Sequence, residues 1–174
     1  MAKPESNLKN MTLTLLVITA VASVALGLVY NATMDVIAQA KVKQLNSAIA
    51  DVIPAFDKID ESVLKPDTGK DDLICYEAFK NEQLIGIAIK TYTDNGFSGR
   101  FWIIVGFDPE GKILNYNVLE HKETPGLGDK MTFWFKDSTN ASRSIIGKST
   151  DNNNLTVKKD GGEVDAITAS TISS

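Results

Sequence analysis

The longest apolar stretch of the chain lies near its beginning. Residues Met11 to Tyr30, MTLTLLVITAVASVALGLVY, include no charged side chain. A helix of this length spans about 30 Å, which matches the hydrocarbon core of a bilayer. A cleaved signal peptide, cut near Ala22-Ser23-Val24-Ala25, is the alternative, but the run is longer than the apolar core of such leaders. We therefore predict a transmembrane helix over residues 11–30 that remains part of the protein.

The charges that flank this segment predict its orientation. On the short side, the amino terminus, Lys3 and Lys9 outweigh Glu5, whereas the nearest charge on the long side is Asp35. Positive flanks favour the cytoplasmic side of a membrane. We expect residues 1–10 to be cytoplasmic and the rest of the chain to be extracytoplasmic.

A helical pattern continues beyond the membrane segment. Apolar residues from Val36 to Val52 recur at steps of three, four and five residues, and Pro54 follows. This pattern predicts a stalk helix over residues 31–53. Residues 56–72 are charged and are interrupted by Pro66 and Gly69, so we expect a loop or a short helix there.

The pattern then changes to that of a β-sheet. Four runs are rich in β-branched and aromatic residues, namely residues 73–79, 84–92, 101–107 and 112–119. Asp108-Pro-Glu-Gly111 is typical of a tight turn and joins the last two runs as a hairpin. We expect a polar surface excursion over 138–154 and a last short strand over 155–158. The predicted class is α+β: an antiparallel sheet with helices on one side.

Composition excludes several classes of protein. The 174 residues are 43% apolar and carry a formal net charge of −4, with one cysteine and one histidine. A basic surface for nucleic acid is not expected. A single Cys75 and a single His121 exclude an internal disulfide and any multi-cysteine or multi-histidine metal site. We expect Cys75 to be a buried, unreactive thiol.

Two stretches are unusual for their chemistry. The last ten residues, from Asp165 to Ser174, include five hydroxyl side chains and no basic residue. Helix capping is the ordinary explanation of such residues. Residues 120–128 combine two glycines with a proline, and their ordinary explanation is a turn before a helix. In that helix Asp129 would lie in the first turn, and residues 133–135 would pack inward.

A hydrolase that uses Ser170 is a poor alternative, because His121 is the one histidine available as a base and no nucleophile elbow is present. The sequence therefore predicts no catalytic residue and no metal ligand.

Together the two stretches resemble one family. Asp165-Ala-Ile-Thr-Ala-Ser-Thr171 is similar to the flavinylation motif of extracytoplasmic FMN-binding domains, Asp-x-x-Ser/Thr-Gly/Ala-Ala/Ser-Thr. His121–Asp129, which follows Val105–Ile113, resembles the G subunit of the Rnf electron-transport complex. The C subunit of the sodium-pumping NADH:quinone reductase is its near relative. The resemblance covers nearly the whole chain and implies that residues 54–174 form an FMN-binding domain.

The resemblance implies a role for Thr171. This residue would carry FMN through a phosphoester bond, made by a separate flavin transferase that uses FAD and magnesium. An unassisted threonine hydroxyl is a poor nucleophile, which fits a substrate of another enzyme. Ser170 and Thr168 would donate hydrogen bonds to the phosphate. Asp165 would orient the hydroxyl or serve the metal of the transferase, although helix capping explains it too.

The glycine-rich loop supplies the other expected site residues. The predicted wall of the flavin site consists of Glu123, Thr124, Pro125, Gly126, Leu127 and Gly128.

Some positions depart from the family pattern. The commoner sequence has Gly and Ala at Ala169 and Ser170, and Gly-Tyr-x-Gly-Pro at residues 96–100. The second departure puts any contact of that proline in doubt. Relatives usually continue with a short helix, whereas this sequence ends three residues after Thr171, which is consistent with a shortened end.

The implied function is electron relay through covalent FMN by a single-pass subunit in a bacterial or archaeal cell membrane. Its partners would be the other membrane subunits of a complex that couples ferredoxin oxidation and NAD reduction to ion transport, and the subunit would not be catalytic alone. No dinucleotide fingerprint occurs, so we expect NAD to bind elsewhere. The short length favours Rnf over the quinone reductase. The alternative is an anchored extracytoplasmic binding or assembly domain without a redox cofactor.

Overall fold

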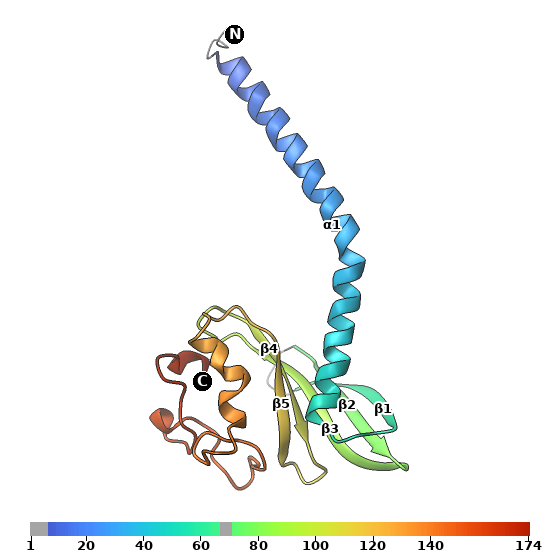
Figure 1. Ribbon diagram of the computed structural model, residues 1–174, viewed down its shortest axis with the longest axis vertical. Helices are drawn as coiled ribbons and strands as arrows, with labels where there is room; N and C mark the ends of the chain where they lie inside the picture. Colours follow the sequence, from blue (N-terminus) through green and yellow to red (C-terminus); the bar gives the residue numbers. More distant parts are fainter. Residues whose placement is uncertain (1–6, 67–70) are drawn as a thin grey trace. The chain divides into compact units, whose positions relative to one another are not determined.

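The computed structural model describes residues 7–66 and 71–174, except for the side chain of Thr171 (Figure 1). The chain divides into two units, residues 1–43 and 44–174. Lys3, Glu5 and Gly69, which entered the predictions above, lie outside the described residues.

The first unit is almost entirely helical. A single helix, α1 (Leu8–Val52), includes the predicted membrane segment and the predicted stalk without a break. By length and composition it is able to cross a membrane, with a window of mean hydropathy 2.4 in which no residue is buried. Its threonine hydroxyls are satisfied inside the helix: Thr12 and Thr33, for example, donate to the carbonyl groups of Leu8 and Val29 at 2.9 and 2.8 Å. Internal pairing of this kind is what an apolar surrounding requires.

The second unit is built on an antiparallel sheet of five strands in the order β1-β2-β3-β4-β5 (Figure 1). The strands are β1 (Lys58–Leu64), β2 (Leu73–Lys80), β3 (Gln83–Thr93), β4 (Phe101–Phe107) and β5 (Ile113–Glu120). The last four confirm the predicted runs to within one residue at each end. The α+β class is confirmed as well.

Strand β1 corrects one prediction. Its residues were expected in a loop or short helix, but they pair with β2 from Lys58↔Phe79 to Leu64↔Leu73. Ile59 is partly buried and packs against the core, whereas the rest of the strand is exposed. An exposed edge strand has no alternation of apolar and polar positions, and its charged residues protect the sheet edge from further pairing.

The core of this unit lies where the end of α1 packs on the sheet. Ala48, Ile49 and Val52 of the helix contact a floor that includes Ala88 and Ile104, both fully buried. Gly106 permits the approach, because a Cβ atom there would lie 2.0 Å from the carbonyl oxygen of Val52. The backbone of the helix therefore rests directly on β4.

Cys75 on β2 is buried and makes no disulfide, as predicted. Burial, and secondly the charge of Glu77, raises the pKa of its thiol.

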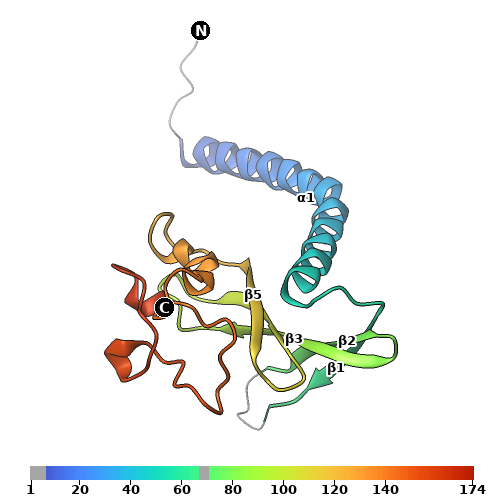
Figure 2. The ribbon, with the colours of Figure 1, turned by 60° about the horizontal axis from the view of Figure 1, so that its bottom comes forward.

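The chain from residue 121 onward has little regular structure (Figure 2). Four 3-10 helices occur in its described part: η1 (Gly128–Thr132), η2 (Trp134–Lys136), η3 (Lys158–Asp160) and η4 (Thr171–Ser173). The predicted surface excursion over 138–154 consists of turns. Two expectations for this region are wrong.

The predicted strand over 155–158 is reduced to one parallel bridge, Val157↔Val164. The pairing is local: Lys158 N donates to the Val164 carbonyl at 2.8 Å, and Val164 N donates to the Thr156 carbonyl at 3.2 Å.

The predicted helix after Gly128 is a pair of 3-10 turns, and Asp129 lies in the first of them. Phe133, expected to pack inward, is 59% exposed, and Trp134 and Phe135 are partly buried.

Candidate functional site

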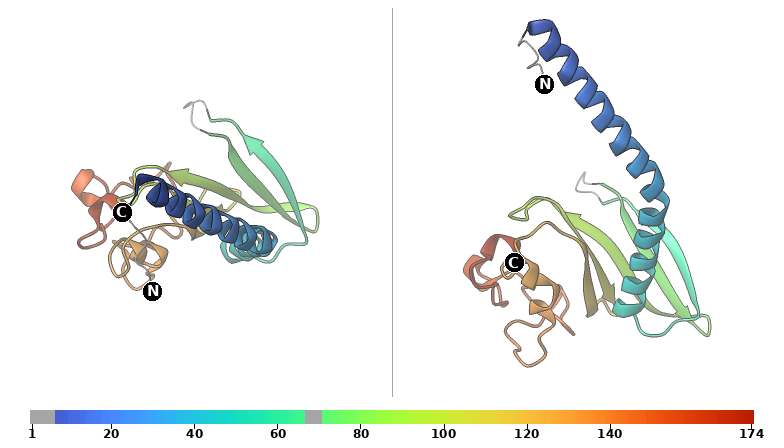
Figure 3. Two further views of the ribbon diagram at one scale, coloured as in Figure 1. Left: turned by 90° about the horizontal axis from the view of Figure 1, so that it is seen from above. Right: turned by 45° about the horizontal axis from the view of Figure 1, so that its top comes forward.

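A pocket of about 380 Å³ lies between the carboxyl-terminal residues and the loop that follows β5. Figures 1 and 3 show the end of the chain beside the segment that carries η1 and η2. The lining residues come from three separate parts of the sequence: Phe97; Glu123, Thr124, Leu127 and Gly128; and Lys159, Ala169, Ser170 and Ile172. The site therefore exists only after folding.

A tight turn shapes one wall of this pocket. The amide of Leu127 donates to the carbonyl of Thr124 at 3.1 Å, with Pro125 and Gly126 between them. Gly126 has φ +78°. Proline at the second position and glycine with positive φ at the third are the residues that a type II turn requires. The turn directs Leu127 into the lining.

Glu123 is the central polar group of the site. Its side chain is only 6% exposed. The carboxylate accepts hydrogen bonds from the hydroxyl of Ser173 at 2.6 Å and from the amide of Ser98 at 3.0 Å. Charge-assisted bonds of this kind compensate the burial of a carboxylate. Glu123 thus fixes the end of the chain to the loop before β4.

Two glycines make room for this carboxylate. A Cβ atom at Gly128 would lie 2.5 Å from Oε2 of Glu123, and one at Gly96 would lie 2.9 Å from Oε1. Both positions therefore need glycine for a close approach to Glu123.

The tail that precedes Ser173 is a compact turn. Ile167 is buried, and its amide donates to the hydroxyl of Ser174 at 2.9 Å, which in turn donates to the carbonyl of Ser170 at 2.8 Å. Ala169 has φ +64°, in the left-handed region that favours glycine. The commoner family sequence has glycine at this position.

The structure brings some of the predicted residues together and leaves others apart. Glu123, Thr124, Leu127, Gly128 and Ser170 line one pocket. The remaining described candidates, Pro125, Gly126, Thr168 and Asp165, are not in that lining. Pro125 and Gly126 act through the turn instead.

Asp165 anchors the tail from outside the pocket. Its carboxylate pairs with Nζ of Lys158 at 2.8 Å, and its carbonyl accepts from the indole of Trp134 at 3.0 Å. The guanidinium of Arg143 lies 4.0 Å from the Trp134 ring and covers it. Asp165 therefore connects η3, η2 and the tail.

The side chain of Thr171 lies outside the described part of the structure. Its backbone begins η4, between Ser170 and Ile172, which both line the pocket. Ser170 occupies the N-cap of η4 but makes no side-chain capping bond. Helix capping by this serine, the ordinary explanation of the motif, is therefore not what the fold shows.

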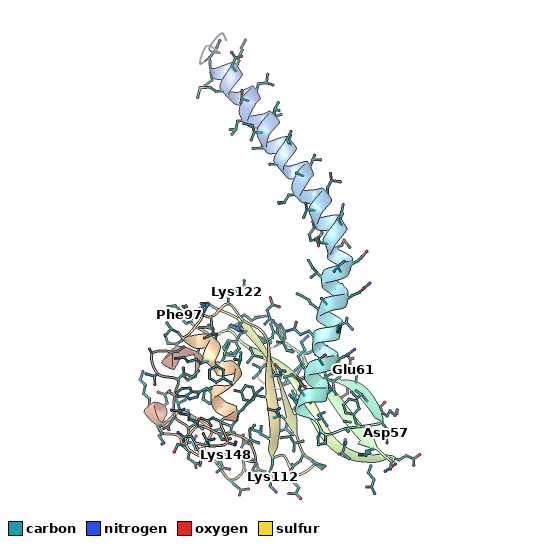
Figure 4. The ribbon with its side chains drawn as sticks, viewed as in Figure 1. Asp57, Glu61, Phe97, Lys112, Lys122 and Lys148 are labelled. Carbon is teal, nitrogen blue, oxygen red and sulfur yellow. The ribbon has the colours of Figure 1, made fainter. Side chains whose placement is uncertain are left out.

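Several site residues gave no clear signal in the sequence analysis. Phe97 and Ile172 are apolar, yet they are 70% and 64% exposed at the pocket. Figure 4 labels Phe97 at the edge of the second unit. Exposed apolar side chains next to a hydroxyl-rich motif are a usable sign of a ligand site. No sequence pattern indicated that Ser173 and Lys159 belong to this site, and only the folded structure shows them there.

The chemistry of the lining fits a planar aromatic ligand that carries an anion. Phe97, Leu127 and Ile172 offer apolar contact, and one carboxylate and one ammonium group accompany them. His121 is not in the lining, and its Nδ1 accepts from the amide of Glu123 at 3.3 Å. Among the described residues no cluster of metal-ligating side chains occurs. The apolar contacts and the two charged groups of the lining support the binding of a ligand.

Comparison with known proteins agrees with this site. Residues 96–174 match the family model of the FMN-binding domain, and this range includes the whole pocket lining. Relatives that are named as the G subunit of an ion-translocating oxidoreductase complex match over most of the chain. The protein of Vibrio vulnificus strain YJ016 is 38% identical over 150 residues, 80% of this chain and 70% of the relative. That of Aliivibrio fischeri strain ES114 is 32% identical over 179 residues, 96% of this chain and 83% of the relative.

These likenesses extend from the apolar helix to the terminal motif. The chain therefore belongs to the family of the G subunits of ion-translocating oxidoreductase complexes.

Proposed function

We propose that this chain is a membrane-anchored flavoprotein subunit that relays electrons through FMN attached by a phosphoester bond to Thr171, within an Rnf-type ferredoxin:NAD oxidoreductase. One observation carries the proposal. The two neighbours of Thr171 in the chain, Ser170 and Ile172, both line the pocket to which Glu123 and Ser173 fix the tail.

The residues present fit the flavin. The pocket has apolar walls from Phe97, Leu127 and Ile172, which suit a flat ring system. Thr124 and Ser170 offer hydroxyl groups at its polar side. Ala169, which has the left-handed conformation, and Ser170 both line the pocket directly before Thr171 in the chain.

FMN, when bound, supplies the redox chemistry, and the protein supplies its position and electrostatic surroundings. Phe97, Leu127 and Ile172 would limit the access of water to one side of the ring. Glu123 would act indirectly, because both of its oxygens already accept hydrogen bonds that hold the tail and the loop before β4.

Attachment of the flavin requires a second enzyme. A threonine hydroxyl is a poor nucleophile at neutral pH, and no described pocket residue is a histidine or cysteine base. A flavin transferase with FAD and magnesium would form the bond from Thr171 Oγ to phosphorus, break the phosphoanhydride of FAD and release AMP. Asp165 is bound to Lys158, so a role toward the metal of that enzyme would need this pair to open.

Helix α1 would anchor the subunit among its membrane partners, with residues 11–30 in the bilayer and residues 31–53 as the stalk. Residues 1–10 would be cytoplasmic and residues 54–174 extracytoplasmic. The complex would couple ferredoxin oxidation and NAD reduction to ion transport. The name shared by the relatives, which describes the G subunit of an ion-translocating oxidoreductase complex, supports this assignment.

The test is to produce the full chain with and without a flavin transferase and to image denaturing gels under ultraviolet light. We expect a fluorescent band and an intact mass raised by one FMN phosphoryl group. Thr171→Ala should abolish both, whereas Thr168→Ala, in the same motif, should retain the label. A wild-type band that stays dark beside an active transferase would favour the anchored domain without a redox cofactor.

A further inference from the structure

Lys159 occupies a distinctive position at the flavin site. It lines the pocket described above and also a second pocket of about 500 Å³, which is lined by Thr93, Asn95, Phe101, Asp160, Ser173 and Ser174 as well. Among the described residues, Lys159 and Ile172 belong to both linings. Lys159 thus lines the same pocket as Ser170 and Ile172, the two neighbours of Thr171 in the chain.

Among the described residues that line these two pockets, Lys159 is also the one basic residue. In the described part of the chain it forms no hydrogen bond and no ion pair. The preceding residue, Lys158, differs in this respect, because its ammonium group pairs with Asp165 at 2.8 Å. The two consecutive lysines of η3 therefore differ: Lys158 is paired with a carboxylate, and Lys159 forms no ion pair in the described structure.

The carboxylates near Lys159 do not neutralise it. Glu123 is engaged by Ser173 and Ser98. Asp160 lines the second pocket. In the described structure it forms no ion pair with Lys159, and the ion pair of this turn is that of Lys158 with Asp165. An exposed ammonium group in an acidic chain is therefore left open to an added anion.

The backbone that carries Lys159 is firmly held. The amide of Gly161 donates to the carbonyl of Lys158 at 3.2 Å, and the amide of Gly162 donates to that of Val157 at 3.1 Å. Gly162 also contacts the preceding segment so closely that a Cβ atom would lie 1.8 Å from the Thr156 carbonyl oxygen. These contacts therefore hold the backbone of Lys159 in place.

We propose that the ammonium group of Lys159 binds the phosphate of the flavin attached to Thr171. A phosphodiester carries one negative charge, and lysine binds such a group as a point charge. The inference rests on the proposed function, because the phosphate must lie one bond from Oγ of Thr171. Lys159 is a positioning residue in this scheme: it holds the phosphate end while the apolar residues contact the ring.

The test is phosphorus NMR of the full-length flavinylated protein in detergent, titrated from about pH 7 to about pH 11. A phosphodiester does not itself ionise in this range, whereas a lysine loses its proton near pH 10.4 in model peptides. We expect the resonance of the attached phosphate to move within this pH range, because a contacting amine loses its charge there. In Lys159→Gln and in Lys159→Arg the movement should disappear, and in Lys158→Gln it should persist.

The results separate the possible contacts of Lys159. A titration that persists in Lys159→Gln would overturn the proposal. A reduction potential that falls in Lys159→Gln, without any change of the phosphorus resonance, would place the ammonium against the ring and would also overturn it. Intact mass is measured first: a protein without the FMN adduct shows that the attachment at Thr171 fails, and the phosphate contact then fails with it.

Discussion

The sheet of the second unit and the chain that follows it are held together by different means. From Gln44 to Glu120, five paired strands and the end of α1 enclose an apolar core. From His121 to Ser174, the described structure has four 3-10 helices and one β-bridge. Side chains such as Glu123, Trp134 and Ser174 make the connections there.

The difference shows which part of the molecule depends on the identity of individual residues. A sheet stabilised by its ladder and its core tolerates exchanges among apolar residues of similar volume. The C-terminal part instead depends on hydrogen bonds between particular donors and acceptors, such as those that Glu123 accepts from Ser173 and Ser98. The pocket draws most of its lining from this irregular part, while Phe97 comes from the loop before β4. Binding residues on loops above a rigid scaffold are a common arrangement.

The largest effects should come from two glycine substitutions, one in each region. Gly106→Ala would place a Cβ atom 2.0 Å from the Val52 carbonyl oxygen, and neither backbone can move without separating α1 from the sheet. We expect a loss of about 3 kcal/mol in the free energy of unfolding, measured by urea denaturation in detergent. Gly27→Ala, where nothing lies within 4 Å, is the control and should change little.

Gly162→Ala makes the same change in the irregular region, where the Cβ atom would meet the Thr156 carbonyl oxygen. We expect local opening of residues 155–174 and loss of flavin loading, with a change of about 1 kcal/mol or less in the main transition. Hydrogen exchange would locate the opening. If Gly162→Ala destabilised the sheet as much as Gly106→Ala, the two regions would be one cooperative unit.

A smaller effect is expected from Glu123→Gln. The substitution removes the charge from the bonds to Ser173 and Ser98, which should cost about 1.5–3 kcal/mol locally. Hydrogen exchange of residues 167–174 should accelerate, and flavinylation should slow. Glu110→Gln is the matched control, because the exposed carboxylate of Glu110 forms a surface ion pair with Lys112 at 2.6 Å. Unchanged exchange in the tail would refute the role of Glu123.

Ala169→Gly should have the opposite sign. Its φ of +64° is unfavourable for alanine by about 1–2 kcal/mol, while glycine loses part of that gain through the entropy of the unfolded chain. We expect a net stabilisation of about 0.5–1 kcal/mol without loss of flavin loading. A destabilised Ala169→Gly protein would mean that the methyl group contributes packing that outweighs the strain.

The smallest expected effect is on the pH dependence of the free energy of unfolding. Hydrogen bonds from the Thr139 hydroxyl and amide, and then the charge of Arg143, lower the pKa of Asp137 from its ordinary value of 3.8. A carboxyl with a lowered pKa in the folded state stabilises the fold above its ordinary value and loses this contribution as the pH falls. Asp137→Asn should therefore be slightly less stable than wild type at neutral pH, and the difference should vanish in acid. The urea midpoints of wild type and Asp137→Asn, measured at neutral pH and in acid, test this prediction. A difference between the two proteins that is the same at both pH values would contradict it.

Much of the fold could be predicted because its signals are local. The uncharged run from Met11 to Tyr30 and four of the five strands follow from periodicity and side-chain type. Strand β1 could not be found in this way, because an exposed edge needs no apolar face. The bridge at Val157 replaced a predicted strand, because the 3-10 helix η3 (Lys158–Asp160) begins directly after it.

The candidate site divides in the same manner. By itself, the sequence determined the turn of Pro125 and Gly126, the hydroxyl-rich motif and the family to which both point. Only the tertiary structure gave the described terminal hydroxyls their partners: Ser173 binds Glu123, and Ser174 binds the amide of Ile167. Serine and threonine bond any nearby donor or acceptor, so composition does not select the partner. The partner of Ser173 lies 50 residues away in the sequence, and only the fold brings the two side chains together.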